Sequence, residues 1–346
     1  MFKKKFHDIS CLVVGLGSIG TRHAHNLKKL KIKNISLFDQ DYKKAKKVGK
    51  SLDAETYSSF QTALSNKPDL CLICTYPNTH IDIAKKCIEN NSNIFIEKPL
   101  STTTLGIQSL ISNAMKKNLK IGVGHNLRFD PGLIYLKNQI QLKSIGNILS
   151  ISVQMGNHIK NWRPGTNYKN HYILKTDGGI ILDDSHEYDY LRWLLNDEVQ
   201  SVYCQTNSIK TLKTKSESLA TIILRFRKGT IATLLMDHVR PSYERNCFVI
   251  GDKGSIKWEN FNFNSSSWNT YNSRSRSIVK TIKINGNVDS KSFNFYTNDP
   301  YISEIKEFFN SIIDNNKNQN GIDAFKTLKI GIAALNSSNK NKIIKL

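Results

Sequence analysis

The sequence predicts an α/β protein in which an N-terminal doubly wound parallel sheet is followed by an α+β domain with a mostly antiparallel, open sheet. Three observations predict this fold class. Up to about residue 125, short apolar runs alternate with amphipathic helical stretches, the pattern of a parallel sheet covered on both faces. Further on, successive runs alternate apolar with polar residues, as antiparallel strands do. The length of 346 residues allows two hydrophobic cores.

The composition is that of a globular protein, with 39% hydrophobic and 23% charged residues. No apolar run approaches the roughly 20 residues that cross a bilayer. The start of the chain is basic, but its apolar run is broken by glycine and lacks the small-residue cleavage site of a signal peptide. We therefore expect a cytoplasmic protein with no membrane partner.

The net charge of +22 comes from basic residues scattered along the chain. Lys43, Lys44, Lys46 and Lys47, for example, fall on an expected solvent-facing helix. This scatter indicates a lysine-rich composition, so we expect no nucleic-acid partner. The six cysteines include one C-x-x-C pair, but it lies in an apolar strand, where residues three apart point to opposite faces. We expect reduced structural thiols and no metal site.

Strands and helices are expected to alternate in the first domain. The first strand, residues 11–14, leads into a helix at 21–30 whose apolar residues have helical spacing. A strand at 34–38 follows. The later elements are a strand at 69–75, a helix at 79–90, a strand at 93–96, a helix capped near Ser101 and a strand at 120–123.

The second domain begins with a helix that Asp130 caps and Pro131 starts. Its first strand, at 148–155, alternates apolar residues with Ser and Gln, which predicts one buried face. The Asn- and Ser-rich stretch 260–277 is expected to be a loop. The other elements are strands at 199–205, 219–227, 230–238, 247–250 and 255–258, and helices at 300–313 and 322–335.

The first domain is organised around a glycine motif between its first strand and its first helix. In a dinucleotide-binding turn, the first glycine allows the bend, the second a close pyrophosphate and the third close packing of helix on strand. The free N–H groups of the helix N-terminus would hold the phosphates. The alternative is a turn without a ligand. The position of the motif between a strand and a helix at the start of the chain favours a Rossmann domain over residues 1–126. The cofactor is then expected to contact Gly15, Gly17, Ser18, Ile19 and Gly20.

Asp39 ends the second strand, nineteen residues after Gly20. A carboxylate there can accept hydrogen bonds from both ribose hydroxyls of the adenosine half and would repel a 2′-phosphate. The alternative is an ordinary turn aspartate, since Asp is common after strands. Together with the glycine motif, Asp39 predicts NAD as the cofactor, with NADP less favoured.

The chain resembles the glucose–fructose oxidoreductase and inositol 2-dehydrogenase family, also called Gfo/Idh/MocA, nearly from end to end. Glu97-Lys98-Pro99, after the fifth strand, is the most specific part of this resemblance. The resemblance implies a dehydrogenase with a substrate-binding and dimerisation domain at residues 127–346, whose final helix could pack back on the first domain. Because an open sheet with one exposed face suggests pairing through that face, we expect a homodimer or homotetramer. The other matching stretches are the glycine motif, residues 74–80 and 126–129, Gly178-Gly179 with Asp183 and His186, and residues 328–338.

The resemblance implies catalytic roles for Lys98, His186 and Asp183. Lys98 would lie beside the cationic nicotinamide ring, and desolvation together with that charge favours the neutral amine, which can accept a hydroxyl proton. A surface lysine is the alternative. A spacing of three would put Asp183 and His186 on one helix face, where a carboxylate can orient an imidazole. Asp184 or Asp189 could serve instead, or Asp183 could be a helix cap.

Further site residues lie in loops at strand ends and in a long loop of the second domain. Additional cofactor contacts are expected from Thr75, Tyr76, Pro77, Asn78, His80, Glu97, Lys98 and Asn126. An aromatic face with basic groups suits a sugar that carries an anionic group. The expected substrate-binding residues are Lys98, Arg128, Trp162, Arg163, Tyr168, Asp183 and His186.

These features predict an oxidoreductase of carbohydrate metabolism. It would transfer a hydride between NAD and the hydroxyl-bearing carbon of a sugar, a sugar derivative such as a nucleotide sugar, or a polyol. Two alternatives remain open. One is a glycoside hydrolase or lyase on the same fold that uses bound NAD for transient oxidation. The other is a non-catalytic sensor of NAD and a sugar.

Overall fold

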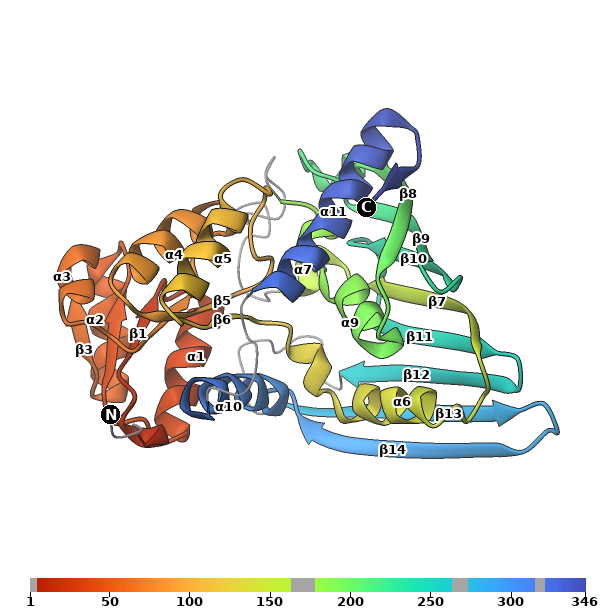
Figure 1. Ribbon diagram of the computed structural model, residues 1–346, viewed down its shortest axis with the longest axis horizontal. Coiled ribbons are helices and arrows are strands. Elements are labelled where there is room, and N and C mark those ends of the chain that lie inside the picture. Colours follow the sequence, from red (N-terminus) through yellow and green to blue (C-terminus); the bar gives the residue numbers. More distant parts are fainter. Residues whose placement is uncertain (1–4, 163–177, 263–272, 315–320) are drawn as a thin grey trace. The chain divides into compact units, whose positions relative to one another are not determined.

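The computed structural model describes residues 5–162, 178–262, 273–314 and 321–346 (Figure 1). The chain forms two compact units. The first comprises Met1–His125 with Tyr301–Lys326, and the second comprises Asn126–Pro300 with Thr327–Leu346. Each unit has its own sheet and its own hydrophobic core.

The first unit contains a parallel sheet with the strand order β3-β2-β1-β4-β5-β6. All residues of β1 and β4 are buried, as expected for strands that are covered on both faces. The order reverses between β1 and β4, where sheets of this kind bind ligands. This confirms the predicted doubly wound sheet. Its strands are β1 (Cys11–Val14), β2 (Ile35–Phe38), β3 (Glu55–Tyr57), β4 (Leu70–Ile73), β5 (Asn93–Ile96) and β6 (Ile121–Val123).

One face of this sheet packs against α1 (Ser18–Lys29), α2 (Tyr42–Leu52) and α10 (Asp299–Asp314). Leu27 of α1, Leu37 of β2 and Phe95 of β5 are buried in that shared core. The remaining helices of the unit are α3 (Phe60–Ser65), α4 (His80–Glu89) and α5 (Ile107–Lys116).

Helix α10 belongs to the first unit, whereas the sequence places residues 300–313 in the second domain. Its apolar face carries Ile305, Phe308 and Phe309, which are buried in the first unit's core. The Phe308 ring lies against Phe95, with 5.5 Å between centroids, and over Gly122, where a Cβ would lie 2.6 Å from the ring. The aromatic residues of α10 therefore complete that core. The expectation that the final helix packs back on the first domain stays a prediction, and the start of that helix, Ile322–Lys326, is part of the first unit.

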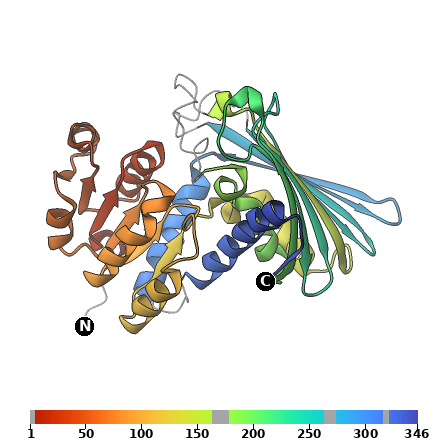
Figure 2. The same ribbon diagram turned by 90° about the horizontal axis from the view of Figure 1, so that it is seen from above.

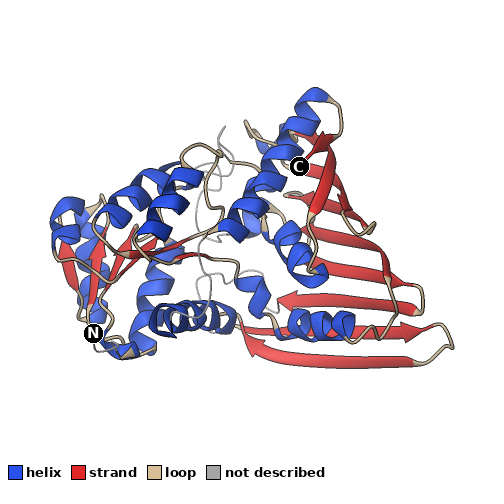
Figure 3. Cartoon of the chain, in the orientation of Figure 1, coloured by secondary structure: helices blue, strands red, loops and turns tan. Residues whose placement is uncertain are grey.

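The second unit contains a large sheet with the order β14-β13-β12-β11-β7-β10-β9-β8-β15. All neighbouring strands in this order are antiparallel except β7 and β10, which run parallel. The predicted mostly antiparallel sheet is therefore confirmed (Figure 3). Its strands are β7 (Ile148–Gly156), β8 (Val199–Asn207), β9 (Leu219–Phe226), β10 (Ile231–Asp237), β11 (Glu244–Gly251), β12 (Gly254–Asn262), β13 (Arg274–Lys283), β14 (Val288–Tyr296) and β15 (Ile344–Lys345).

Helices α6 (Pro131–Gln141), α9 (His186–Leu195) and α11 (Ile322–Lys340) cover one face of this sheet (Figure 2). Short helices α7 (Ile159–Trp162) and α8 (Ile180–Asp183) precede α9. In the described ranges, no helix is long and apolar enough to span a bilayer. All six cysteines are buried free thiols.

The expectation of a loop at 260–277 is wrong at both ends of that stretch. Residue Asn260 pairs with Ser277 across the antiparallel strands β12 and β13. Both side chains approach the buried Asp130, the N-cap of α6, at 2.9 Å from Asn260 Nδ2 and 2.7 Å from Ser277 Oγ. Polar residues therefore occupy strand positions here because a buried carboxylate accepts their hydrogen bonds. Residues 263–272 lie outside the described ranges.

Candidate active site

The glycine motif forms the tight turn from β1 into α1. Gly15 has a positive φ of 87°, and a Cβ on it would lie 2.8 Å from the Thr75 side chain. Gly20 packs directly against the Gly15 carbonyl, so a Cβ there would overlap that oxygen. Gly17, by contrast, has nothing within 4 Å of where its Cβ would lie. The structure thus gives the three glycines the bend, the open approach and the close packing that a dinucleotide requires.

The N-terminus of α1 opens at this turn. Gly17 is the N-cap residue, and no side chain caps the helix there. The first-turn N–H groups, which include those of Ser18 and Ile19, have no acceptor within the helix and carry the positive end of its dipole. This end of the helix fits the pyrophosphate of a dinucleotide.

Asp39 lies beside the same turn, directly after β2. Its Oδ2 accepts the Leu16 N–H at 2.6 Å, and its Oδ1 accepts the Asp41 N–H at 2.9 Å. Lys44 Nζ lies 3.5 Å from Oδ2. The carboxylate is thereby fixed next to the glycine turn, the place from which it would reach an adenosine ribose.

A second loop follows β4 and carries four of the expected cofactor contacts. Thr75 Oγ1 and Thr79 Oγ1 are 2.7 Å apart, which closes the turn. Tyr76 is 60% exposed, Asn78 is also exposed, and Pro77 is buried.

His80 begins α4 and connects this loop to the next one. Its Nδ1 lies 3.1 Å from the Pro99 carbonyl oxygen and its Nε2 lies 3.1 Å from that of Thr75. Burial lowers the pKa of this imidazole, although its contacts with the two carbonyl groups oppose the shift. His80 therefore fixes the β4 loop against the segment that contains Lys98.

Lys98 lies at the carboxyl end of β5, at the same edge of the sheet as the glycine turn. Its backbone N–H donates to Glu97 Oε2 at 3.2 Å, and the Lys98–Pro99 peptide bond is cis. Glu97 Oε1 in turn lies 2.5 Å from Nε2 of His23 on α1. Glu97, an expected cofactor ligand, therefore bonds to His23 and to the Lys98 N–H of its own unit, and these contacts fix the backbone of Lys98.

In the second unit, the expected single helix through Asp183 and His186 is wrong. Asp183 ends α8, the chain leaves helical geometry at Asp184 with ψ of 41°, and α9 starts at His186. The break accompanies a buried ion pair, since Asp184 Oδ1 accepts from Arg245 at 2.9 Å. Glu187 also lies 3.0 Å from the Arg245 guanidinium. Asp183 and His186 are both buried, but they belong to different helices and therefore do not share a helix face.

Asp189, the other candidate partner of His186, holds Arg128. The Arg128 guanidinium donates to both Asp189 oxygens, at 2.7 and 2.6 Å, and Thr327 Oγ1 donates to Oδ1 at 3.0 Å. This bidentate pair fixes the 3₁₀ turn Asn126–Phe129 to α9. Arg128 was expected to bind substrate, and its side chain is 23% exposed.

Of the other expected site residues in the second unit, two lie within the described residues and two lie outside them. Asn126 is buried at the start of the 3₁₀ turn. Trp162 is the last residue of α7. Arg163 and Tyr168 lie outside the described residues, which omit 163–177.

Glu304 was not predicted from the sequence as a site residue, and no functional role was expected for His23. Glu304 lies on α10 between Tyr301 and Phe308, within the apolar stripe that faces the first unit's core. Its side chain is 4% exposed. A carboxylate inside an apolar helical stripe was the signal that could have identified it.

Comparisons with known proteins agree with this geometry. A family model described as "Oxidoreductase family, NAD-binding Rossmann fold" matches residues 9–125, and the "GFO/IDH/MocA C-terminal domain" model matches residues 133–257. A myo-inositol 2-dehydrogenase of Thermotoga maritima is 26% identical over 96% of this chain and 97% of its own length. A scyllo-inositol 2-dehydrogenase (NAD(+)) of Bacillus subtilis is 30% identical over 57% of this chain and 56% of its own length.

Solved structures share the fold. The crystal structure of an oxidoreductase from Agrobacterium radiobacter in complex with NAD⁺, L-tartaric acid and magnesium covers 98% of this chain and of its own. It superposes with a TM-score of 0.81 at 17% identity. The agreement at such low identity shows that the two-unit architecture is common to both chains.

Proposed function

Because the chain belongs to the GFO/IDH/MocA family of NAD-binding oxidoreductases, we propose that it oxidises a hydroxyl group of a sugar, sugar derivative or polyol. An inositol is the first substrate to consider, since the myo-inositol 2-dehydrogenase of Thermotoga maritima is similar over nearly the whole chain. The observation that carries the proposal is the placement of Lys98 at the strand edge that also holds the glycine turn.

In the proposed reaction, the neutral Lys98 amine accepts the proton of the substrate hydroxyl as the carbon–hydrogen bond of the same carbon breaks. Bound NAD⁺ supplies the acceptor for the hydride that leaves this carbon. The substrate thereby becomes a ketone or aldehyde, and reduction runs the same steps in reverse. His186 and Asp183 of the second unit are proposed to assist proton transfer.

The residues around the glycine turn suit NAD. Gly15, Gly17 and Gly20 provide the turn, and the α1 N-terminus provides donors for the pyrophosphate. We propose that Asp39 selects NAD over NADP, because its carboxylate, fixed by the Leu16 and Asp41 N–H groups, would repel a 2′-phosphate.

A substrate screen tests the proposed function. The protein is incubated with NAD⁺ and with inositols, other polyols, sugars or nucleotide sugars, and absorbance at 340 nm is followed. We expect reduction of NAD⁺ with at least one of them. Binding of NAD without turnover of any compound would favour a sensor. Cleavage of a glycoside without net NADH would favour the hydrolase or lyase alternative.

We also propose that the second unit forms a homodimer through the uncovered face of its sheet. Ile223, Ile231 and Ile250 are each about 40% exposed there, on three strands of the same sheet. Ile231 and Ile250 both pair with Ser150 of β7, from opposite sides, so they lie on one continuous surface. A second copy of the chain could cover these residues. The cytoplasmic location remains a prediction from the sequence.

A further inference from the structure

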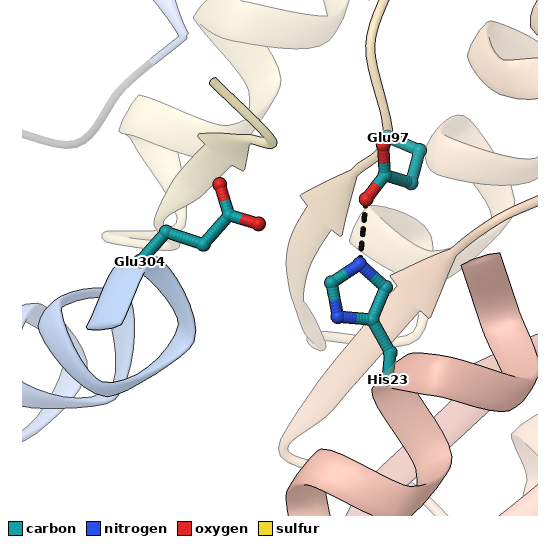
Figure 4. A group of neighbouring side chains, drawn as sticks. All are labelled: His23, Glu97 and Glu304. Atoms are coloured by element: carbon teal, nitrogen blue, oxygen red, sulfur yellow. Dashed lines mark hydrogen bonds and ion pairs between the residues drawn. The ribbon is translucent and has the colours of Figure 1, made fainter. Parts of the chain in front are cut away.

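Three buried ionisable side chains meet behind Lys98 in the first unit. His23 comes from α1, Glu97 from the end of β5 and Glu304 from α10 (Figure 4). They are 0%, 6% and 4% exposed. One nitrogen or oxygen atom of each lies within 4.8 Å of the other two. Within the described part of the chain, neither carboxyl oxygen of Glu304 has a hydrogen-bond partner.

The pKa values of the two carboxyl groups are shifted in opposite directions. Burial raises the pKa of Glu304 well above its usual value, the charge of Glu97 raises it further, and Arg22 opposes both. For Glu97, burial also raises the pKa, but the hydrogen bond and charge of His23, with those of Lys98, outweigh it and leave the pKa lowered. The shifts are opposite in direction, so Glu304 keeps its proton to a higher pH than Glu97 does.

The neighbours of Glu304 on each element are consistent with its raised pKa. From α1, Arg22 lies over the Tyr301 ring of α10, with 4.5 Å between its guanidinium carbon and the ring centroid. At the end of β4, burial raises the pKa of the Cys74 thiol, which is therefore neutral. Burial likewise raises the pKa of Tyr301. Two basic side chains also act on the pair: Arg22 lowers the pKa of Glu304, and Lys98 lowers the pKa of Glu97.

A divalent cation is a weaker explanation of the same cluster. His23 Nε2 and Glu97 Oε1 are 2.5 Å apart, whereas two ligands on one zinc ion lie about 3.3 Å apart, given bonds of about 2.0 to 2.1 Å. The distance is that of a direct hydrogen bond between Nε2 and the Glu97 carboxyl group. Arg22, in the same buried region, would also repel a cation.

We propose that His23 and Glu304 are positioning residues for Lys98: His23 fixes the Glu97 carboxylate, Glu304 faces it as a neutral acid, and Glu97 sets the orientation and the local charge of Lys98. The orientation follows from the 3.2 Å hydrogen bond between the Lys98 N–H and Glu97 Oε2. The local charge matters because each nearby carboxylate favours the ammonium form of the lysine, which cannot accept a proton. This inference rests on the proposed role of Lys98 as the base.

The test follows the Lys98 amine directly. The full chain is labelled with ¹³C-lysine, Lys98→Met identifies the Lys98 signal, and the titration midpoint is read by NMR. We expect Glu97→Gln to lower this midpoint by about one pH unit or more, since an opposite charge is lost. Glu304→Gln, a neutral substitute for the protonated acid, should move it by less than about 0.3 pH unit. An unchanged midpoint in Glu97→Gln, or equal shifts in both variants, would overturn the proposal.

A second measurement tests the proton on Glu304. A carboxyl group whose folded-state pKa is raised stabilises the fold below its unfolded pKa, and this stability is lost as pH rises through the folded pKa. The free energy of unfolding in urea should therefore fall above about pH 4.5 in the parent, and this fall should be smaller in Glu304→Gln. Zinc or manganese that raises the melting temperature of the parent but not of Glu304→Gln would instead reveal a cation site.

Asp130→Asn is the matched control. It makes the same carboxylate-to-amide change at a buried position of the second unit. We expect it to leave the Lys98 midpoint unchanged, whatever it does to stability. These readouts need no substrate. If the midpoints move as expected while no compound is oxidised, the positioning network stands and the proposed function fails.

Discussion

Lys98 differs from the many other lysines of this chain by what holds its backbone. Glu97 accepts its N–H, and His80 contacts the carbonyl of the following Pro99. Because these contacts fix the backbone of Lys98, they limit the region that its amine can reach. A general base needs this kind of placement, because proton transfer requires hydrogen-bond reach to the reacting hydroxyl.

Replacing Lys98 by alanine should remove most of the turnover and leave cofactor binding intact. Loss of a general base typically costs a factor of about 10² to 10⁴ in rate. The comparison is kcat on the substrate that the screen identifies, with the NAD Kd measured by calorimetry. Lys47→Ala, on the exposed side of α2, is the control and should behave as the parent. Near-parental turnover in Lys98→Ala would reject Lys98 as the base.

Replacing Asp39 by serine should weaken discrimination against NADP. The substitution removes the charge that opposes a 2′-phosphate, and Lys44, now 3.5 Å from the carboxylate, would become available to it. We expect the ratio of the Kd for NADP to the Kd for NAD to fall about tenfold, which corresponds to about 1.4 kcal/mol. Calorimetric titration with both cofactors measures this ratio. A parent that already binds NADP more tightly would contradict the assigned preference.

At the scale of elements, two glycines of the turn from β1 into α1 are expected to have different roles, one in packing and the other in cofactor binding. Gly20 contacts the Gly15 carbonyl, whereas Gly17 faces open space. Gly20→Ala should therefore destabilise the protein without ligand, by about 1 to 3 kcal/mol of overpacking. Gly17→Ala should unfold like the parent but bind NAD more weakly. Urea unfolding and calorimetry distinguish the two, and equal unfolding curves for both variants would contradict the argument.

The start of α6 depends on one buried carboxylate that joins the helix to two strands. Asp130 accepts hydrogen bonds from the N–H groups of Gly132 and Leu133, and from Trp258, Asn260 and Ser277 of β12 and β13. Hydrogen-bond donors from a helix and from two strands therefore share Asp130 as their acceptor.

Asp130→Ala should lower the free energy of unfolding by about 3 kcal/mol, because it removes a helix cap and leaves buried donors unpaired. The exposed cap of α2 provides the comparison. Within the described ranges, the Asp41 side chain accepts hydrogen bonds from the N–H groups of Lys43 and Lys44 alone, and Asp41→Ala should cost about 1 kcal/mol. Urea unfolding of both variants measures the difference. Equal losses would show that the contacts with β12 and β13 add nothing.

At the scale of the whole molecule, the uncovered face of the nine-stranded sheet should decide the oligomeric state. Ile231→Glu places a charge on the sheet face that also carries the exposed side chains of Ile223 and Ile250. We expect a dimer for the parent and a monomer for the variant, as measured by light scattering after gel filtration. Ile284→Glu, at an exposed turn between β13 and β14, should remain dimeric. A monomeric parent would contradict the proposed interface.

The sequence by itself determined what depends on local pattern. The alternation of apolar runs with helical stretches predicted the parallel sheet, and the alternating strands predicted the antiparallel one, because side-chain periods of 3.6 and 2 reflect which faces are buried. The glycine motif predicted a turn because only glycine tolerates the positive φ of Gly15 and the contact at Gly20. The short apolar run before Lys98 likewise predicted that this residue follows the end of a strand.

Only the tertiary structure decided which distant residues meet. The regular spacing of Asp183, His186 and Asp189 predicted one helix face, but the ion pair of Asp184 with Arg245, sixty-one residues away, accompanies a break in that helix. His23 and Glu97 are seventy-four residues apart, and α10 adds its carboxyl group from the far end of the chain. Periodicity indicates which face of an element is buried but not against what, so neither the place of α10 nor the buried cluster behind Lys98 could be read from the sequence.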